Sequence, residues 1–377
     1  MSNSTSAFHR SLDRLKAEWL LGLFVMLAIG LAMIDPRPLS AYRHWLQFPT
    51  LAGLLGLLIA IQGIRDSGWV QRAASALAAR MHSVRTLGLL LVVTTALLSM
   101  VLTNDASLFL IVPLTLALGA ASNLPVLRMV VLEALAVNAG STLSPIGSPQ
   151  NLLLWQAAHV RFIDFVAAML PAAAVMLALL LALTWCWLPP TRIQLDGKIK
   201  HGNTSAPLAV LSCIALGGMV VLTEFGHAPL GALLMLSGFG LLRWRTLAAI
   251  DWWLLVTFAA IFLGLGHLAD LAPTSHALDR FDFSQPLTLF ISGVIASQLI
   301  SNVPATVLLL ERAADPLALA VAVNVGGFGL AIGSMANLIA LRLARQSHGL
   351  RQFHQISIPF LLVCAPLTYL AWRWITF

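Results

Sequence analysis

The most constraining feature of the sequence is a succession of apolar segments that begins at Trp19 and continues to the C-terminus. Many of them reach the ~20 residues with which a helix crosses a bilayer. The chain is 59% hydrophobic and only 10% charged, whereas a soluble domain carries roughly 25% charged residues. No sizeable soluble domain fits between the segments. The sequence therefore predicts an all-α polytopic membrane protein surrounded by membrane lipid.

The basic residues predict how the chain crosses the membrane. If segment 1–16 is a cytoplasmic N-terminus, 16 of the 22 Lys and Arg residues fall on the inner side, as the positive-inside rule requires. The net charge of +7 then reflects topology, and we expect no nucleic-acid partner. This arrangement has about nine full spans plus two re-entrant hairpins, and it places the C-terminus outside. The expected spans are 17–34, 50–64, 129–159, 162–188, 207–225, 228–242, 252–268, 316–341 and 355–375.

Two polar interruptions of the apolar segments match each other. Aligning NAGSTLSPIGSPQNL (138–152) with NVGGFGLAIGSMANL (324–338) gives seven identities in fifteen positions at a fixed offset of 186. Each copy is preceded by a shorter interruption, LTNDAS (102–107) or ISNVPAT (300–306), centred on Asn104 or Asn302. The two copies have opposite orientations in the predicted topology. Inverted repeats with paired interruptions are typical of secondary transporters, whose binding site lies at the repeat interface near the midplane.

We therefore predict two inverted-topology repeats, each with a re-entrant helical hairpin and a broken transmembrane helix. The first repeat is 17–188, with hairpin 86–119 and broken helix 129–159. A cytoplasmic linker, 189–206, leads to the second repeat, 207–377, with hairpin 285–312 and broken helix 316–341. Glycine and serine also permit ordinary close packing of membrane helices. Two matched copies that carry proline and asparagine favour the broken helices.

Non-helical backbone at membrane depth must be buried in protein or line a wet cavity. Ser148 reads as an N-cap with Pro149 at the first helical position, and Ser301 or Asn302 with Pro304 repeats this pattern. A helix N-terminus favours anions, whereas carbonyls freed near glycines suit sodium. We expect substrate or ion binding by Thr103, Asn104, Asp105, Ser144, Gly147, Ser148, Asn151, Ser301, Asn302, Gly326, Gly333, Ser334 and Asn337, and transient sodium at Gly140, Asn104, Gly327 and Asn302, with no tightly bound metal and no cofactor.

Asp105 is the one acid that the prediction places at a hairpin tip. An intramembrane ionisable residue is a functional candidate by default, so we interpret Asp105 as the residue that couples transport to a proton or cation. The alternative is that Asp105 only caps the helix that follows. The sequence contains no HExxH, GxSxG or P-loop lysine, and its three cysteines lack CxxC spacing. These absences favour a protein that is not an enzyme.

The paired tips TND and SNVPA, with the crossings SPIGSPQN and GGFGLAIGSMAN, resemble the ion transporter superfamily. The resemblance is closest to the citrate-transporter-like and arsenite permease (ArsB, NhaD) branch, in particular to bacterial inner-membrane permeases of the YbiR type. It implies an inner-membrane location, a homodimer and an elevator-like movement of the substrate-carrying part. Relatives with dicarboxylate substrates carry Ser-Asn-Thr at both tips. Neither tip here does, which favours the arsenite and sodium–proton relatives.

The expected function is therefore a secondary transporter that moves a small inorganic or organic anion and is coupled to protons or sodium. A sodium/proton antiporter of the same superfamily is the first alternative. An uncoupled channel-like or structural membrane protein is the alternative from another class.

Overall fold

The structure is a computed structural model that describes residues 19–78, 81–120, 124–193, 204–344, 346 and 348–376. The secondary structure of these ranges is helical, apart from an isolated bridge between Ser83 and Arg192. The predicted cytoplasmic segment 1–16 lies outside the described residues, as does most of the predicted linker. An all-α chain is confirmed for the part that the structure describes.

The first half of the chain contains two pairs of closely connected helices. The segment predicted as hairpin 86–119 holds α6 and α7, and the segment predicted as broken helix 129–159 holds α8 and α9. A short helix, α5, precedes the first pair, and a long helix, α10, follows the second. The helices of this half are α2 (Trp19–Ile34), α3 (Leu39–Trp45), α4 (Phe48–Asp66), α5 (Trp69–Ala78), α6 (Val84–Val101), α7 (Asn104–Ala120), α8 (Val126–Ser141), α9 (Pro149–Ala158) and α10 (Phe162–Trp187).

The second half has a similar order of elements. Segment 285–312 holds α15 and α16, and segment 316–341 holds α17, the short η1 and α18. The helix observed at the expected span 228–242 is longer than predicted: α12 continues to Ala249, beyond a non-helical Arg243. The helices are α11 (Ala206–Glu224), α12 (Ala228–Ala249), α13 (Trp252–Asp270), α14 (Ala272–Leu278), α15 (Pro286–Ile300), α16 (Asn302–Leu310), α17 (Pro316–Val325), η1 (Ala331–Gly333), α18 (Met335–Ala344) and α19 (Gly349–Thr376).

Six of the described helices are long and apolar enough to cross a membrane: α4, α6, α10, α11, α13 and α19. The helices next to the interruptions are apolar but shorter, among them α7, α15, α17 and α18. At 1.5 Å per residue, helices of 10 to 17 residues are shorter than the ~30 Å hydrocarbon core of a bilayer.

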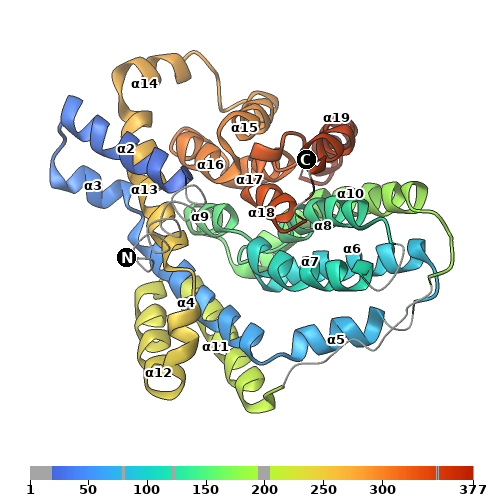
Figure 1. Cartoon of the computed structure of the whole chain (residues 1–377). Helices are drawn as coiled ribbons and strands as arrows, with labels where there is room; N and C mark the ends of the chain where they lie inside the picture. The colour runs from blue at the N-terminus through green and yellow to red at the C-terminus, as the bar shows by residue number, and fades with distance from the viewer. Residues whose placement is uncertain are drawn as a thin grey trace, which may run out of the picture.

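The helices form two packing groups (Figure 1). In one group α2, α4, α11, α12 and α13 pack against one another; in the other α6, α7, α8, α10, α15, α17, α18 and α19 do so. The centre of the second group is the most buried region: every residue of 129–141 in α8 and of 318–325 in α17 is buried. Many of these residues are alanine, whose small side chain lets membrane helices approach closely. The groups meet mainly through α9 and α16.

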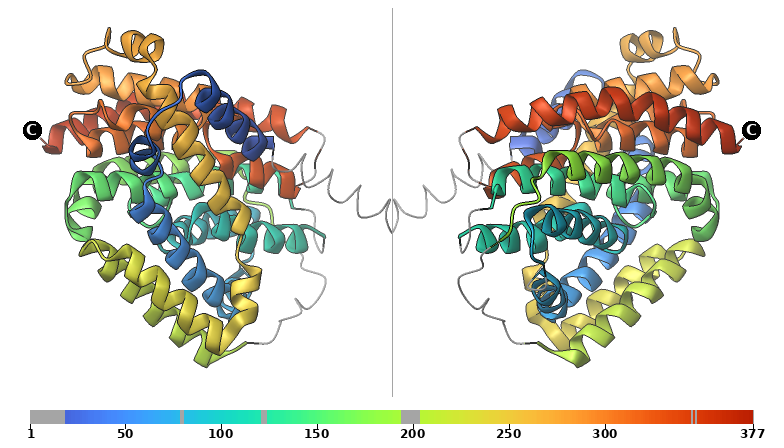
Figure 2. Two further views of the ribbon diagram at one scale, coloured as in Figure 1. Left: turned by 90° about the vertical axis from the view of Figure 1, so that its left-hand side faces the viewer. Right: turned by 90° about the vertical axis from the view of Figure 1, so that its right-hand side faces the viewer.

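The helix ends gather at two opposite ends of the molecule (Figure 2). At one, the Ser205 N–H donates to the Ser67 carbonyl at 2.9 Å and the Val84 N–H to the Thr191 carbonyl at 3.0 Å. At the other, His44 Nε2 lies 3.0 Å from Glu311 Oε1. We name the first the basic end, because Arg72, Arg85 and Arg192 contact the segments that meet there. We name the second the acidic end, because Asp270, Asp279 and Glu311 make contacts there, Asp279 with Arg312.

Candidate functional site

The first interruption separates α8 from α9. Helix α8 ends at Ser141, and α9 starts at Pro149, which lacks an N–H and fits the first helical position. The end of α8 leaves carbonyls without intrahelical donors. The Asn151 side-chain amide donates to two carbonyls of this segment, that of Ser141 at 2.9 Å and that of Ser144 at 3.1 Å. Asn151 therefore closes the break from inside the protein.

The second interruption repeats this bonding. The Asn337 side-chain amide donates to the Gly327 carbonyl at 2.8 Å. Asn337 and Gly327 stand 186 positions after Asn151 and Ser141, the offset of the aligned segments. The same donor thus satisfies the same carbonyl in both copies.

Four asparagines connect the two interruptions, and we name them the asparagine brace: Asn138, Asn151, Asn324 and Asn337. The Asn138 amide donates to Asn337 Oδ1 at 2.9 Å, and the Asn324 amide donates to Asn151 Oδ1 at 2.6 Å. All four side chains are buried. Buried amides are expected to be hydrogen-bonded, and here each copy supplies the partners of the other.

The two helix pairs before the interruptions pack against the broken helices through glycine. A Cβ atom at Gly140 would collide with the Ala96 carbonyl and with Ser99 on α6; one at Gly326 would collide with Ser297 on α15. Gly140 therefore lets α6 approach the backbone of α8, and Gly326 lets α15 approach the backbone at the end of α17. In addition, the Asn104 N–H donates to the Gly147 carbonyl at 3.1 Å, which joins the first tip to the first break.

The second tip contains an unusual backbone conformation. Ser301 joins α15 to α16 with φ 75° and ψ 156°, a region that is essentially restricted to glycine and costs about 1–3 kcal/mol. Strained residues persist where the surrounding structure determines them, and they cluster at binding sites. Ser301 is buried, and the next residue, Asn302, lines a cavity.

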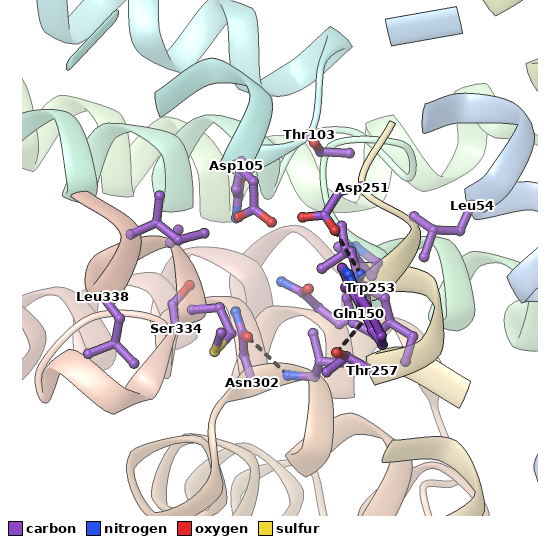
Figure 3. A pocket seen from close by; sticks show the side chains of 18 of the residues that line it. Leu54, Thr103, Asp105, Gln150, Asp251, Trp253, Thr257, Asn302, Ser334 and Leu338 are labelled. Carbon is purple, nitrogen blue, oxygen red and sulfur yellow. Dashed lines mark hydrogen bonds between the residues drawn. The ribbon is translucent and has the colours of Figure 1, made fainter. Parts of the chain in front are cut away.

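Both tips and both broken helices meet at one cavity of about 740 Å³ (Figure 3), which we name the main cavity. Its volume lies in the ~300–1,000 Å³ range of small-molecule sites. The tips contribute Thr103, Asn104, Asp105, Asn302 and Val303; the starts of α9 and α18 contribute Pro149, Gln150, Ser334, Met335 and Ala336.

The structure separates the predicted site residues into two sets. Thr103, Asn104, Asp105, Asn302 and Ser334 line the main cavity. The others do not line it; they build the breaks and the second tip around it. These are Gly140, Ser144, Gly147, Ser148, Asn151, Ser301, Gly326, Gly327, Gly333 and Asn337.

Several polar residues of the main cavity were missed by sequence reasoning: Gln150, Asp251, Trp253, Thr257 and Arg342. Arg342 is one of the basic residues that the positive-inside pattern explains by topology, and Gln150 lies in the first aligned segment, between Pro149 and Asn151. Asp251 directly precedes an apolar run, and its carboxylate accepts the Leu254 N–H at 3.1 Å. That pattern signals a helix start but says nothing about a cavity.

Two side-chain oxygens near the first tip have no hydrogen-bond partner in the described part of the protein: Asn104 Oδ1 and Ser148 Oγ. Both residues are buried, with 6% and 1% of their surface exposed. A buried unpartnered oxygen costs roughly 1–3 kcal/mol. Of these two residues only Asn104 lines the main cavity, so Asn104 Oδ1 marks a position where a ligand can complete the hydrogen bonding or coordination. Among the described residues, no three His, Cys, Asp or Glu side chains are grouped as in a metal site.

Several short helices start at one cavity, among helices that are long and apolar enough to cross a membrane. This arrangement is typical of a membrane transporter. Residues 17–317 match the citrate transporter (CitMHS) family. The chain belongs to this family.

Individual relatives agree with this assignment. The inner membrane protein YbiR of Escherichia coli is 38% identical over 95% of this chain and 96% of its own length. An uncharacterized transporter of Methanocaldococcus jannaschii is 30% identical over 85% of this chain and 88% of its own. The crystal structure of the YdaH transporter of Alcanivorax borkumensis, described as having an unusual topology, has a TM-score of 0.53 at 17% identity and covers 96% of this chain and 98% of its own. These findings support a membrane location and a transporter fold.

Proposed function

We propose that the protein is a secondary active transporter that moves a small inorganic or organic anion and is coupled to protons or sodium. The observation that carries the proposal is the main cavity, where both tips and both broken helices converge. Polar groups that would be costly in lipid are collected there at one place. One relative is named for an inorganic solute: a silicon efflux transporter of Oryza sativa subsp. japonica. It is 31% identical over 41% of this chain and 30% of its own length.

We also propose that segments 17–188 and 207–377 are inverted-topology repeats, with about nine full spans and two re-entrant hairpins. The paired contacts support this arrangement. Ser99 lies against Gly140, and Ser297 lies against Gly326. The two serines stand 198 positions apart, the same offset as between the tips at Asn104 and Asn302. The two glycines stand 186 positions apart, the offset of the aligned segments. Repetition of tertiary contacts at these offsets is expected if both halves have the same local fold.

The main cavity has positive groups that suit an anion and negative groups that suit a coupling cation. Five helices start at its wall, and helix starts favour anions; they are α7, α9, α13, α16 and α18. Arg342 adds a positive side chain. Asp105 and Asp251 are carboxylates that suit the coupling cation. The same carboxylates favour a sodium/proton antiporter as the second candidate, in which the cation itself is the substrate.

Flux into proteoliposomes tests the proposal. The purified chain is reconstituted and offered a panel of oxyanions, carboxylates and sodium, with and without a proton or sodium gradient. The proposal requires anion accumulation that depends on one of the gradients. Sodium flux driven by protons without any anion would support the antiporter, and steady conductance without counter-ion dependence would support a channel.

We propose that the basic end faces the cytoplasm of the bacterial inner membrane, with the N-terminus inside and the C-terminus in the periplasm. Cys186, Cys213 and Cys364 are the only cysteines, so a cysteine-free background is feasible. Single cysteines placed beside Arg72 and Lys198 are expected to resist an impermeant thiol reagent added outside, whereas one beside Asp279 is expected to react. Equal labelling beside Arg72 and Asp279 would contradict both the orientation and the inverted repeats.

Asn104 and Asn302 are the two asparagines of the main cavity, and we expect Asn→Ala at either to reduce transport at least ~10-fold, the equivalent of 1.4 kcal/mol of binding. The amount of folded protein in the membrane is expected to change little. Asn104 Oδ1 has no partner among the described residues, and Asn302 Oδ1 bonds only to its chain neighbours Ser301 and Val303 in the described part of the protein. Transport rate divided by the amount of folded protein is the measurement. A proportional fall of both quantities would mean that these amides only maintain the fold.

The family resemblance further implies a homodimer with an elevator-like movement, and we retain both as proposals. The two packing groups suit such a movement, because the group that contains the tips and broken helices meets the other mainly through α9 and α16.

A further inference from the structure

Two carboxylates face each other where the main cavity meets a smaller one. The second cavity, of about 370 Å³, lies between the end of α4, the first tip and the start of α13, and we name it the side cavity. Asp105 and Asp251 line both cavities, and their side chains point toward one another in Figure 3. Thr103 lines both cavities too. The two acids therefore stand at the junction of two water-accessible spaces.

The two acids come from different packing groups. Asp105 is in the first turn of α7, which packs against α6, α8 and α18. Asp251 is the N-cap of α13, which packs against α2, α4 and α16. A ligand held by both carboxylates would join one group to the other.

Neither acid has an ion-pair partner among the described residues. The positive side chains of the two cavities are Arg65 and Arg342. The Arg65 guanidinium lies 5.5 Å from the centre of the Phe109 ring and donates to Gln62 Oε1 at 3.2 Å. Asp66, which follows Arg65 in α4, accepts hydrogen bonds from the Gln62 amide and the Thr246 hydroxyl. The facing carboxylates are thus left to repel each other, and a cation between them would reverse that interaction.

Neutral oxygen donors stand beside the pair. Asn104 directly precedes Asp105, lines the main cavity, and its buried Oδ1 has no partner in the described part of the chain. Among the described residues, the Thr103 hydroxyl oxygen accepts only the long 3.4 Å bond from the Ala106 N–H. Carboxylate, amide and hydroxyl oxygens are the donors that hard cations select.

We propose that Asp105 and Asp251 together bind a monovalent cation, sodium, at the junction of the two cavities, with neutral oxygens from Asn104 and Thr103. This inference rests on the proposed function only in taking the main cavity as the transport site. The bound cation links the first tip to the start of α13. Release of the cation leaves two facing carboxylates, which separates the tip from α13. The link between the two packing groups thereby depends on cation occupancy.

Sodium binding to the full chain in detergent tests the site without any transport substrate. The readout is bound ²²Na⁺ in a scintillation proximity assay, with choline keeping the ionic strength constant. We expect Asp251→Asn to raise the half-saturating sodium concentration at least ~10-fold, as Asp105→Asn does, since each removes one negative charge from the site. Asp251→Glu, which keeps the charge, should stay within about threefold of wild type.

Asp315→Asn is the matched control. Asp315 is also an exposed N-cap aspartate, whose carboxylate accepts the Leu317 N–H at 2.8 Å, but it lines neither cavity. Asparagine caps helices as well as aspartate does, so neither Asn variant is expected to disturb folding. Thermal unfolding without sodium verifies this, and sodium binding of Asp315→Asn should equal that of wild type.

Each outcome of the sodium-binding experiment either supports or overturns the proposed site. Unchanged sodium binding in both Asp105→Asn and Asp251→Asn overturns the site, and weakening in Asp105→Asn alone removes Asp251 from it. Competition by protons with no measurable sodium binding overturns sodium as the ligand. Loss of binding in both variants supports the site even if no anion of the panel is transported, in which case only the proposed function fails.

Discussion

Asp105→Asn is expected to abolish accumulation of substrate against a gradient while leaving downhill exchange of substrate measurable. The structure gives the helix-capping role to Thr103, whose hydroxyl oxygen accepts the Ala106 N–H, and Asp105 instead faces the main cavity (Figure 3). Asparagine has the same shape but neither charge nor a titrating proton. A carrier whose coupling group is neutral loses the exchange of proton or cation that drives uphill movement.

The measurement is uptake into proteoliposomes in two modes: uphill, driven by a proton or sodium gradient, and downhill, by exchange of labelled for unlabelled substrate. We expect uphill accumulation to fall at least ~10-fold, to the level of equilibration. The dependence of rate on pH should flatten, because the titrating group is gone. A pH–rate curve superimposable on that of wild type would end the coupling proposal and return Asp105 to a packing role.

Glu133→Gln is the control for this experiment. Glu133 is a fully buried acid of the first half, but it lies between α7 and α8, where Oε1 accepts the Thr115 hydroxyl, and it does not line the main cavity. Glutamine retains an acceptor for Thr115. Equal loss of uphill transport in Glu133→Gln would show that any buried acid of this bundle supports coupling, so the cavity position of Asp105 would no longer explain the effect.

The sequence was informative where chain-local chemistry decides the structure. Pro149 cannot continue a helix from its N-terminal side, and Gly326 and Gly327 weaken one, so the interruptions could be placed within a few residues of the observed helix ends. The repeated asparagines and the fixed offset showed that both halves carry these breaks. Asp105 was found because an acid beside a tip is costly in lipid unless a site requires it.

The sequence was uninformative where the rotation of a helix or a distant partner decides the role of a side chain. Asn104 and Asn151 both stand at interruptions, yet one lines the main cavity and the other closes a break. Sequence patterning does not show which way an amide points. Asp251 arrives at the cavity from the start of α13, about 150 positions from the first tip, and only tertiary packing brings it there.

The asparagine brace leads to a prediction opposite in kind to those for the cavity residues. Asn151→Ala is expected to reduce folded protein strongly. The substitution removes the donor of the Ser141 and Ser144 carbonyls and the acceptor of the Asn324 amide. These groups are buried at a break inside the most buried helices, where each unsatisfied group costs roughly 1–3 kcal/mol.

Interhelical hydrogen bonds measured in membrane proteins contribute less, on average about 0.6 kcal/mol each. For three bonds lost together we expect a loss of stability of about 2 kcal/mol or more. For a chain of this size, that corresponds to a fall in the thermal midpoint of roughly 2–3 °C or more. The midpoint of the purified protein in detergent, followed by size-exclusion chromatography after heating, is the measurement. Asn337→Ala should behave alike, because it removes the corresponding bonds to Gly327 and Asn138.

Asn302→Ala separates the brace from the cavity. Asn302 Oδ1 accepts mainly the N–H of its neighbour Val303, at 2.9 Å, and bonds to no residue of the brace. Its replacement should leave the thermal midpoint within ~1 °C of wild type while reducing transport. If Asn151→Ala instead folded as wild type and lost transport, Asn151 would be a ligand residue and the brace would be a consequence of packing.

A double variant, Asn151→Ala with Asn324→Ala, measures the energetic coupling within the brace. If the brace stabilises the fold, Asn324→Ala should lower the thermal midpoint less in the Asn151→Ala background than in the wild type, because the bond between the two side chains is already lost.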